Sequence, residues 1–297
     1  MITRTIYIGN PAYLQLKDEQ MVISCPMTRE VKGKVAVEDL GVLMLDHFQI
    51  TLTHQLIQKL MKHKVVVISC DETHMPHGIM LPIYGHTEHS DRVKWQLEAS
   101  DPLKKQLWKQ TVEAKIENQT EVLRRMDCYF EPMIEYKQNV KSGDTSNMEG
   151  IAAQHYWKYL ISHDFIRDRH GENPNHLFNF GYIVLRSMVA RAIVETGLLP
   201  VLGIFHKNKY NPYCLADDLM EPYRPFIDML VMKWLDTNPQ AEELTRDFKA
   251  HILQVATVDV EIDKKRRPLM VAIKMSASSL YKCYTGEKRL LLYPTFV

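Results

Sequence analysis

One histidine and several acids lie close together near the stretch 206–225, HKNKYNPYCLADDLMEPYRP. His206 is followed by Asp218 and Glu221, and another acid, Glu149, precedes a run of small residues earlier in the chain. One imidazole with two or three carboxylates, and no cysteine, suits a hard divalent ion such as Mg²⁺ or Mn²⁺. Such an ion lowers the pKa of a bound water or alcohol and neutralises charge that develops on a phosphate. These residues are therefore candidates for a divalent-metal site that acts on phosphate.

The same acids also have a purely structural interpretation. Asp218 and Glu221 are three positions apart, so they share a face on a helix, and the proline that follows is tolerated only in a first helical turn. Both carboxylates would then lie at a helix N-terminus, where acids cap free N–H groups and favour the helix dipole. Glu149, just after the candidate N-cap Asn147, can be explained in the same way, and we expect Asp217 to be a cap.

Basic residues near these acids could complete a site for a phosphate group. Some flank the acids in sequence, and others lie on an apolar helix predicted over 176–197. They are Lys207, Lys209, Arg224, Arg186 and Arg191.

The composition is that of an ordinary globular protein. Of 297 residues, 45% are hydrophobic and 25% are charged, and the formal net charge is +1. No basic tail indicates nucleic acid, so DNA binding would require charge gathered on one face. The five cysteines form no CxxC pair, which favours free thiols in a reducing compartment. We find no signal peptide and no run of roughly 20 apolar residues, so we expect a cytoplasmic protein without a membrane span.

The hydrophobic period changes along the chain. In its first part, short alternating runs broken by turn residues predict strands, with one amphipathic helix over 53–63. KVVVISC, residues 64–70, is almost wholly apolar and predicts a buried strand, and the later part of the chain has a helical period. We expect an α+β protein with three parts: a small β-rich N-terminal domain (1–84), a linker (85–95) and a larger all-helical C-terminal domain (96–297).

Three ordered blocks resemble the CRISPR-associated integrase family, whose members are the catalytic subunit of the spacer-acquisition complex. The resemblance is greatest to the members found in type II systems. The blocks are SCDETHMPHGIMLP (69–82), EGIAAQHYW (149–157) and the long stretch 174–228. The resemblance implies a β-sandwich-like N-terminal domain followed by a helical catalytic domain. It also implies a DNA endonuclease/integrase, in which the 3′-hydroxyl of a short foreign DNA fragment attacks a phosphodiester of a CRISPR repeat array.

The resemblance further implies which residues carry the chemistry. Glu149 in the E-G-x-A-A block, His206 after G-I-F, and Glu221 in D-L-x-E match the family's catalytic ligands for Mg²⁺ or Mn²⁺. Asp218 matches an acid that lies at the site in some members, and is a further candidate ligand. The candidate DNA-binding residues include two that match a block beside the family's site, Asn179 and Tyr182. The full set is Lys207, Lys209, Arg224, Arg186, Asn179 and Tyr182.

Insertion of both ends of one fragment needs two active sites at a fixed separation, whereas one chain has one ligand set. The resemblance implies a homodimer, with two dimers flanking a dimer of a small second CRISPR-associated adaptation protein in a heterohexamer. The nucleic-acid partners would be the double-stranded fragment and the repeat array. We expect edge strands and sheet faces of the N-terminal domain to form the dimer surface.

Two other functions stay open. His74, His77, His86 and His89 form two H-x-x-H pairs, a spacing that can chelate zinc and would indicate a zinc-binding protein. The other alternative is a non-catalytic DNA-binding scaffold, although carboxylates near phosphate repel it unless a cation lies between them. The basic stretch 263–268 could contact DNA, but is at least as well explained as a solvated loop.

Overall fold

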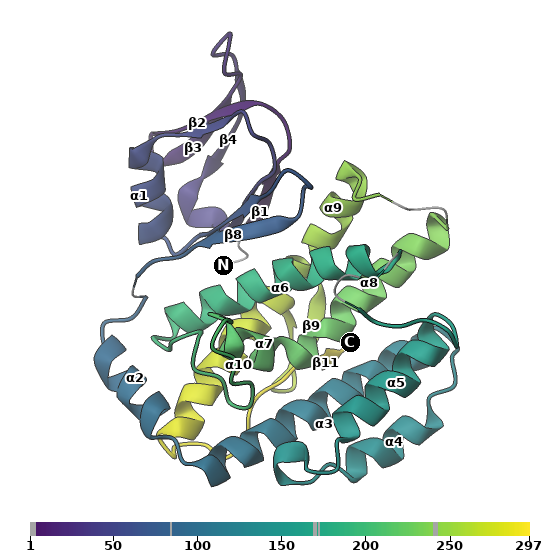
Figure 1. Ribbon diagram of the computed structural model, residues 1–297. Coiled ribbons are helices and arrows are strands. Elements are labelled where there is room, and N and C mark those ends of the chain that lie inside the picture. Colours follow the sequence, from purple (N-terminus) through teal and green to yellow (C-terminus); the bar gives the residue numbers. More distant parts are fainter. Residues whose placement is uncertain (1–3, 84, 169–170, 172, 240–242) are drawn as a thin grey trace.

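A β-rich domain packs on a larger helical domain in the computed structural model, which describes residues 4–83, 85–168, 171, 173–239 and 243–297 (Figure 1). Both ends of the predicted N-terminal domain, residues 1 and 84, lie outside the described residues. The elements of the β-rich domain are β1 (Arg4–Ile8), β2 (Ala12–Lys17), β3 (Gln20–Ser24), β4 (Val31–Ala36), β5 (Leu40–Leu45), β6 (Ile50–Leu52), α1 (His54–Lys62), β7 (Val66–Cys70) and β8 (Pro76–Met80).

Two four-stranded sheets build the β-rich domain. One has the order β1-β5-β7-β8 and the other β4-β3-β2-β6. In the first sheet β1, β5 and β7 run parallel and β8 is antiparallel to β7. Buried side chains from both sheets and from α1 form one apolar cluster, which includes Leu14, Met21, Leu43, Leu56 and Val67. The N-terminal part of the chain is therefore a β-rich domain, as the sequence predicted.

The central strands β5 and β7 are buried on both faces. Leu43 and Val67 belong to the core of the β-rich domain, whereas Val42, Met44 and Ile68 belong to the core of the helical domain. A strand covered on both sides has no reason to alternate apolar and polar residues, which explains the continuous apolar runs in these two strands. The helical domain therefore packs directly on the first sheet.

The helical domain begins at α2. Its helices are α2 (His89–Glu98), α3 (Asp101–Arg125), α4 (Glu131–Gln138), α5 (Met148–Leu160), α6 (Asn175–Glu195), α7 (Cys214–Met220), α8 (Arg224–Thr237), α9 (Arg246–Leu253) and α10 (Leu269–Tyr284). α2 begins within the residues that we predicted as a linker, and α6 crosses the domain beneath the β-rich domain (Figure 1).

α6 is the central helix, as its apolar character on nearly all sides predicted. It is also the one helix in the described part of the chain that is long and apolar enough to cross a membrane, and 72% of its most apolar stretch is buried inside the protein. The expectation that no segment approaches this length and composition was therefore wrong. The apolar composition of α6 reflects its position in a core, where it packs against β7, α7, α8 and α10.

The sequence predicts an all-helical C-terminal domain, but this domain also contains a small β-sheet. β9 (Asp259–Ile262), β10 (Lys265–Pro268) and β11 (Thr295–Phe296) form a small sheet in the order β10-β9-β11. Asp263 and Lys264, both with positive φ (52° and 59°), form the two-residue turn between β9 and β10. Positive φ at both central residues is typical of a hairpin turn. The basic stretch 263–268 is therefore a turn and a strand, and not simply a loop.

Candidate active site

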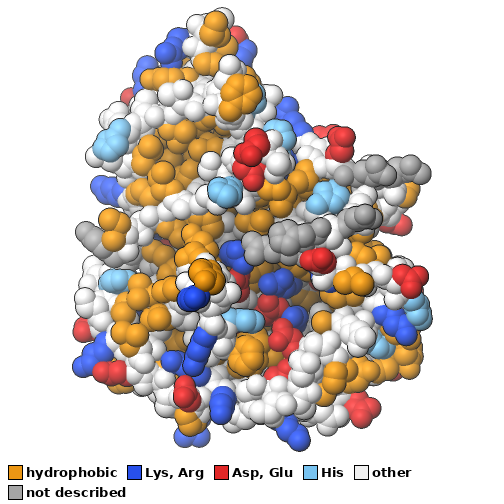
Figure 2. All heavy atoms as spheres, viewed as in Figure 1, with side chains coloured by type: hydrophobic (Ala, Val, Ile, Leu, Met, Phe, Trp, Pro, Cys, Tyr) orange, Lys and Arg blue, Asp and Glu red, His pale blue; other side chains and the backbone are white. Residues whose placement is uncertain are grey.

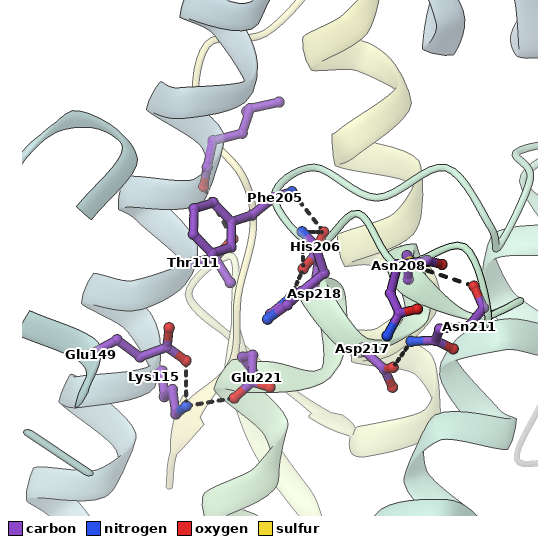
Figure 3. Close-up of polar contacts among 12 residues, drawn as sticks. Thr111, Lys115, Glu149, Phe205, His206, Asn208, Asn211, Asp217, Asp218 and Glu221 are labelled. Atoms are coloured by element: carbon purple, nitrogen blue, oxygen red, sulfur yellow. Dashed lines mark hydrogen bonds and ion pairs between the residues drawn. The ribbon is translucent and has the colours of Figure 1, made fainter. Parts of the chain in front are cut away.

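The carboxylates of Glu149 and Glu221 converge, although they lie far apart in sequence. Glu149 is in the first turn of α5, and Glu221 begins a short 3₁₀ turn between α7 and α8. Both contact Lys115 of α3: Oε1 of Glu149 and Oε2 of Glu221 each lie 2.6 Å from its Nζ atom. Figure 3 shows the ammonium group between the two carboxylates. The helical packing thus brings two acids to one positive charge.

Asp144 positions Glu149 by capping α5. Its two carboxylate oxygens accept hydrogen bonds from the backbone N–H groups of Met148 (2.8 Å) and Glu149 (2.9 Å). Asn147 occupies the N-cap position, as predicted, but its backbone is left-handed (φ 53°) and its side chain makes no capping hydrogen bond. The prediction therefore identified the helix start correctly and the capping side chain wrongly.

Asp218 holds His206 from the interior of the domain. Asp218 is fully buried, and its Oδ2 accepts a hydrogen bond from the backbone N–H of Phe205 at 2.8 Å. Its Oδ1 is hydrogen-bonded to the ring Nδ1 of His206. This hydrogen bond raises the pKa of His206 above its ordinary value, although burial alone would lower it. With the proton on Nδ1, the lone pair of Nε2 is available to a metal ion.

Aromatic side chains fix the loop that carries His206. Trp108 of α3 is buried and stacks on Phe205, with ring centroids 4.4 Å apart. The same indole meets the imidazole of His206 edge-on at 5.5 Å. The imidazole is therefore held both by a carboxylate and by packing on α3, the helix that also supplies Lys115 (Figure 3).

The helix boundaries near these acids differ from the prediction. α7 ends before Glu221, so Asp218 lies in the last turn of a helix and not at a helix N-terminus. Asp217 is not a cap, because its carboxylate accepts hydrogen bonds from Nε and Nη2 of Arg186 at 2.6 and 2.9 Å. It also accepts one from Asn211 at 2.7 Å. Two neighbouring aspartates in α7 thus face different partners.

Four of the six candidate DNA-binding residues have polar partners within the protein. Arg186 pairs with Asp217, as described, and Nε of Arg224 lies 2.9 Å from Oε1 of Glu221. The remaining two contacts are the Tyr182 hydroxyl to Asp228 (2.6 Å) and Asn179 to Arg167 (2.7 Å). Arg191, the further basic residue of α6, pairs with Glu195 at 2.9 Å.

Lys207 and Lys209 lie on the exposed loop before α7. The Nζ atom of Lys209 lies 4.7 Å from the centre of the Tyr210 ring. Exposed ammonium groups on a loop next to His206 are free to meet a phosphate backbone, which is the role that we predicted for them.

Two cavities adjoin the acids and share the residues Arg167, Tyr182 and Arg224 in their walls. The first, of about 720 Å³, is also lined by Lys115 and Glu221. Figure 2 shows Lys, Arg, Asp and Glu side chains gathered in a hollow of the helical domain. Arg167 was not predicted from the sequence, because its polar stretch indicated only the end of a helix. The site is therefore both acidic at its ligands and basic in its surroundings.

Glu149, His206 and Glu221 fit a hard divalent ion by donor type. Oε2 of Glu221 is buried and accepts no well-directed hydrogen bond, although Lys115 lies 2.6 Å away. Burial alone would raise the pKa of Glu221, but Arg224 and Lys115 lower it below its ordinary value, so the carboxylate is ionised. Among the described residues, no three His, Cys, Asp or Glu side chains are already arranged around one point.

The histidines of the zinc hypothesis have other surroundings. Nδ1 of His74 lies 2.8 Å from Oδ1 of Asp46, and Nδ1 of His86 accepts the backbone N–H of Glu88 at 3.1 Å. His77 lies in β8 and His89 begins α2. Within the residues that the structure describes, no metal-binding group includes these side chains.

Comparison with known proteins gives concordant matches. The sequence model of the family described as CRISPR associated protein Cas1 matches residues 6–254. The CRISPR-associated endonuclease Cas1 of Neisseria meningitidis serogroup C (strain 8013) is 33% identical, over 97% of this chain and 94% of that protein.

Solved structures share the fold. A casposase bound to its integration product has a TM-score of 0.80 at 20% identity, covering 98% of this chain and 92% of that chain. A Cas6-RT-Cas1 chain in complex with Cas2 has a TM-score of 0.74 at 16% identity, covering 97% of this chain and 35% of that chain. At these identities the likeness concerns the fold alone.

Proposed function

The chain belongs to the CRISPR-associated Cas1 family, and from this premise we propose that it is a metal-dependent DNA endonuclease and integrase. It inserts short foreign DNA fragments into a CRISPR repeat array, by attack of a fragment 3′-hydroxyl on a phosphodiester. The observation that carries the proposal is that the carboxylates of Glu149 and Glu221 converge on the ammonium group of Lys115, beside the oriented imidazole of His206.

Glu149, Glu221 and Nε2 of His206 would hold the divalent ion, Mg²⁺ or Mn²⁺. When bound, the ion supplies charge neutralisation at the scissile phosphate and favours the alkoxide form of the attacking hydroxyl. We assign Asp218 the role of a positioning residue rather than a ligand, because both of its oxygens already accept hydrogen bonds from Phe205 and His206. Partners of this kind fix the orientation and tautomer of a metal-bound histidine.

The surrounding basic groups would hold the DNA. Arg167 and Arg224 line the cavity next to Glu221, and Lys207 and Lys209 lie on the exposed loop next to His206. In phosphoryl transfer the protein mainly positions the reacting groups and neutralises charge, so a few fixed side chains suffice. Arg186, Asn179 and Tyr182 line the second cavity and would support the DNA path there.

The proposed assembly contains more than one chain. Integration at both ends of a fragment requires two such sites, which a homodimer flanking a small second adaptation protein would supply. The Cas6-RT-Cas1 chain, whose fold this chain shares, is found in a complex with Cas2, which supports a partner of that kind. We propose a heterohexamer that acts on double-stranded DNA in the cytoplasm. Its proposed dimerisation domain, linker and catalytic domain are residues 1–84, 85–95 and 96–297, and the end of this linker forms the first turns of α2.

Strand transfer from a labelled fragment into a repeat-bearing plasmid tests this function. With Mg²⁺ or Mn²⁺ and the small partner, we expect the label to join the plasmid at the repeat ends, and Glu221→Gln to abolish this while still binding the fragment. The proposal would be contradicted if the yield of labelled plasmid with EDTA, or with Glu221→Gln, equalled that of the wild type with the divalent ion.

A further inference from the structure

We propose that Lys115 is a built-in competitor for the divalent ion. Its ammonium group holds the two carboxylates that the ion needs, so the ion must displace it in order to bind both. This inference rests on the proposed metal site and concerns how that site is loaded.

The competition follows from the shared oxygen atoms. Nζ of Lys115 lies 2.6 Å from Oε1 of Glu149 and 2.6 Å from Oε2 of Glu221. An ion bound to the same two oxygens would therefore lie next to the ammonium group. Two cations in contact repel strongly, and the repulsion is weakly screened away from water. The ammonium and the ion consequently exclude each other.

Burial makes Lys115 a strong competitor. Its side chain is 11% exposed and that of Glu221 is 6% exposed, so neither charge is well hydrated. A buried ammonium is retained only where carboxylates compensate its lost hydration. The second oxygen of Glu221 contacts Arg224 at 2.9 Å, so this carboxylate carries a cation on each oxygen. Displacement of Lys115 therefore costs free energy that lowers the apparent affinity for the ion.

The neighbouring cavity offers the displaced ammonium another partner. Lys115 lines the cavity of about 720 Å³ together with Lys158, Arg167 and Arg224. In the proposed function a DNA phosphate lies close to these cations. Such a phosphate would attract the ammonium away from the two acids and make room for the ion. Because coupling between two binding events is reciprocal, DNA would strengthen ion binding and the ion would strengthen DNA binding.

Mn²⁺ binding to the full-length protein without DNA tests the competition, with free Mn²⁺ followed by electron paramagnetic resonance. We expect Lys115→Met to bind Mn²⁺ roughly tenfold or more tightly than the wild type, because the competing state is removed. The matched control is Lys109→Met on the same helix, whose Nζ lies 3.5 Å from Glu113 and away from the two acids. It should bind as the wild type does. Equal or weaker binding by a folded Lys115→Met variant would overturn the inference.

Loss of the ammonium leaves two carboxylates facing each other, so Lys115→Met could unfold without metal. Lys115→Gln keeps a hydrogen-bond donor for them without the charge, and we expect the same tightening in it. Unchanged Mn²⁺ affinity in Lys115→Gln would equally overturn the inference.

Glu221→Gln separates this inference from the proposed function. If Glu221→Gln binds Mn²⁺ as the wild type does, the proposed metal site itself is wrong. If Glu221→Gln weakens binding while the Lys115 variants do not tighten it, the site stands and only the competition is wrong.

Discussion

The buried carboxylate of Asp218 accepts hydrogen bonds from the ring Nδ1 of His206 and from the backbone N–H of Phe205. The two residues come from different segments, His206 from the loop before α7 and Asp218 from the last turn of that helix. This pairing makes the imidazole a directed ligand, with Nε2 turned away from Asp218.

Asp218→Asn should weaken Mn²⁺ binding and strand transfer by about 10- to 100-fold, because His206 loses its fixed tautomer. Fragment binding should stay near the wild-type value, since Asp218 is buried away from DNA. The neighbouring Asp217→Asn is the matched control for Mn²⁺ affinity, because Asp217 contacts Arg186 and Asn211 instead. An equal loss of Mn²⁺ affinity in both variants would argue against a positioning role for Asp218.

Asp144→Ala should reduce stability by about 1 kcal/mol, since it removes the cap of α5. Because the same cap holds the backbone N–H of Glu149, strand transfer should fall more than the loss of folded protein explains. Urea unfolding and an initial-rate assay give the two quantities. Asn147→Ala, at a side chain without a capping hydrogen bond, should change stability less. The opposite order of the two variants would show that the cap is assigned to the wrong side chain.

A buried ion pair connects the two domains, with Nζ of Lys249 in α9 lying 2.6 Å from Oδ2 of Asp46, just after β5. Tyr7 also donates a hydrogen bond to Asp46 at 2.6 Å. Lys249→Met should lower the free energy of unfolding by about 3–5 kcal/mol, because it leaves a buried carboxylate without its cation. Urea unfolding measures this change.

Lys274→Met is the control for that experiment. Its ammonium contacts Glu195 at 3.2 Å, but the side chain is 66% exposed, and Arg191 remains as a partner of Glu195. We expect a change of at most about 1 kcal/mol. A similar decrease in the free energy of unfolding in the two lysine variants would mean that the buried interdomain pair stabilises the protein no more than the exposed pair does.

Asp228 should make stability depend on pH in a recognisable way. It is buried and accepts hydrogen bonds from Tyr182 (2.6 Å) and Tyr156 (3.0 Å). Burial raises its pKa from 3.8 to about 6, although both hydrogen bonds lower it. The native state therefore binds a proton more tightly than the unfolded state, and stability decreases as the pH rises through this interval.

The matching variant is Asp228→Asn, which does not titrate. From about pH 4 to about pH 7, an interval that includes the raised pKa of Asp228, the free energy of unfolding of the wild type should fall by on the order of 2–3 kcal/mol relative to that of Asp228→Asn. Denaturant unfolding of both proteins across this range gives the difference. Parallel pH profiles would show that Asp228 is ionised throughout.

Residue types and motif order were enough to propose Glu149, His206 and Glu221 as site residues, and the structure brings the two acids together at Lys115. Local pattern also identified the central helix α6 and the buried strand β7, because period and composition follow directly from burial. It did not identify β5, which the sequence predicted as an alternating strand and which is buried on both faces. The boundaries around Glu221 were harder to predict, because Pro222 lies within a short 3₁₀ turn, Glu221–Tyr223, that joins two helices with almost no break.

Contacts between distant segments could not be predicted from local pattern. Lys115 lies in the middle of a long helix and resembles any solvated lysine until α5 and the turn at Glu221 pack against it. Lys249 and Asp46 are likewise 203 positions apart in sequence, and nothing near either residue indicates the other. Such pairs depend on tertiary packing, which hydrophobic period does not encode.

Diffraction from Mn²⁺-soaked crystals, recorded at a wavelength where manganese scatters anomalously, tests the central claim most directly. We predict one strong anomalous peak in contact with the carboxylates of Glu149 and Glu221 and with Nε2 of His206, and its loss in Glu221→Gln. A peak elsewhere in the chain, with none at these three side chains, would contradict the account.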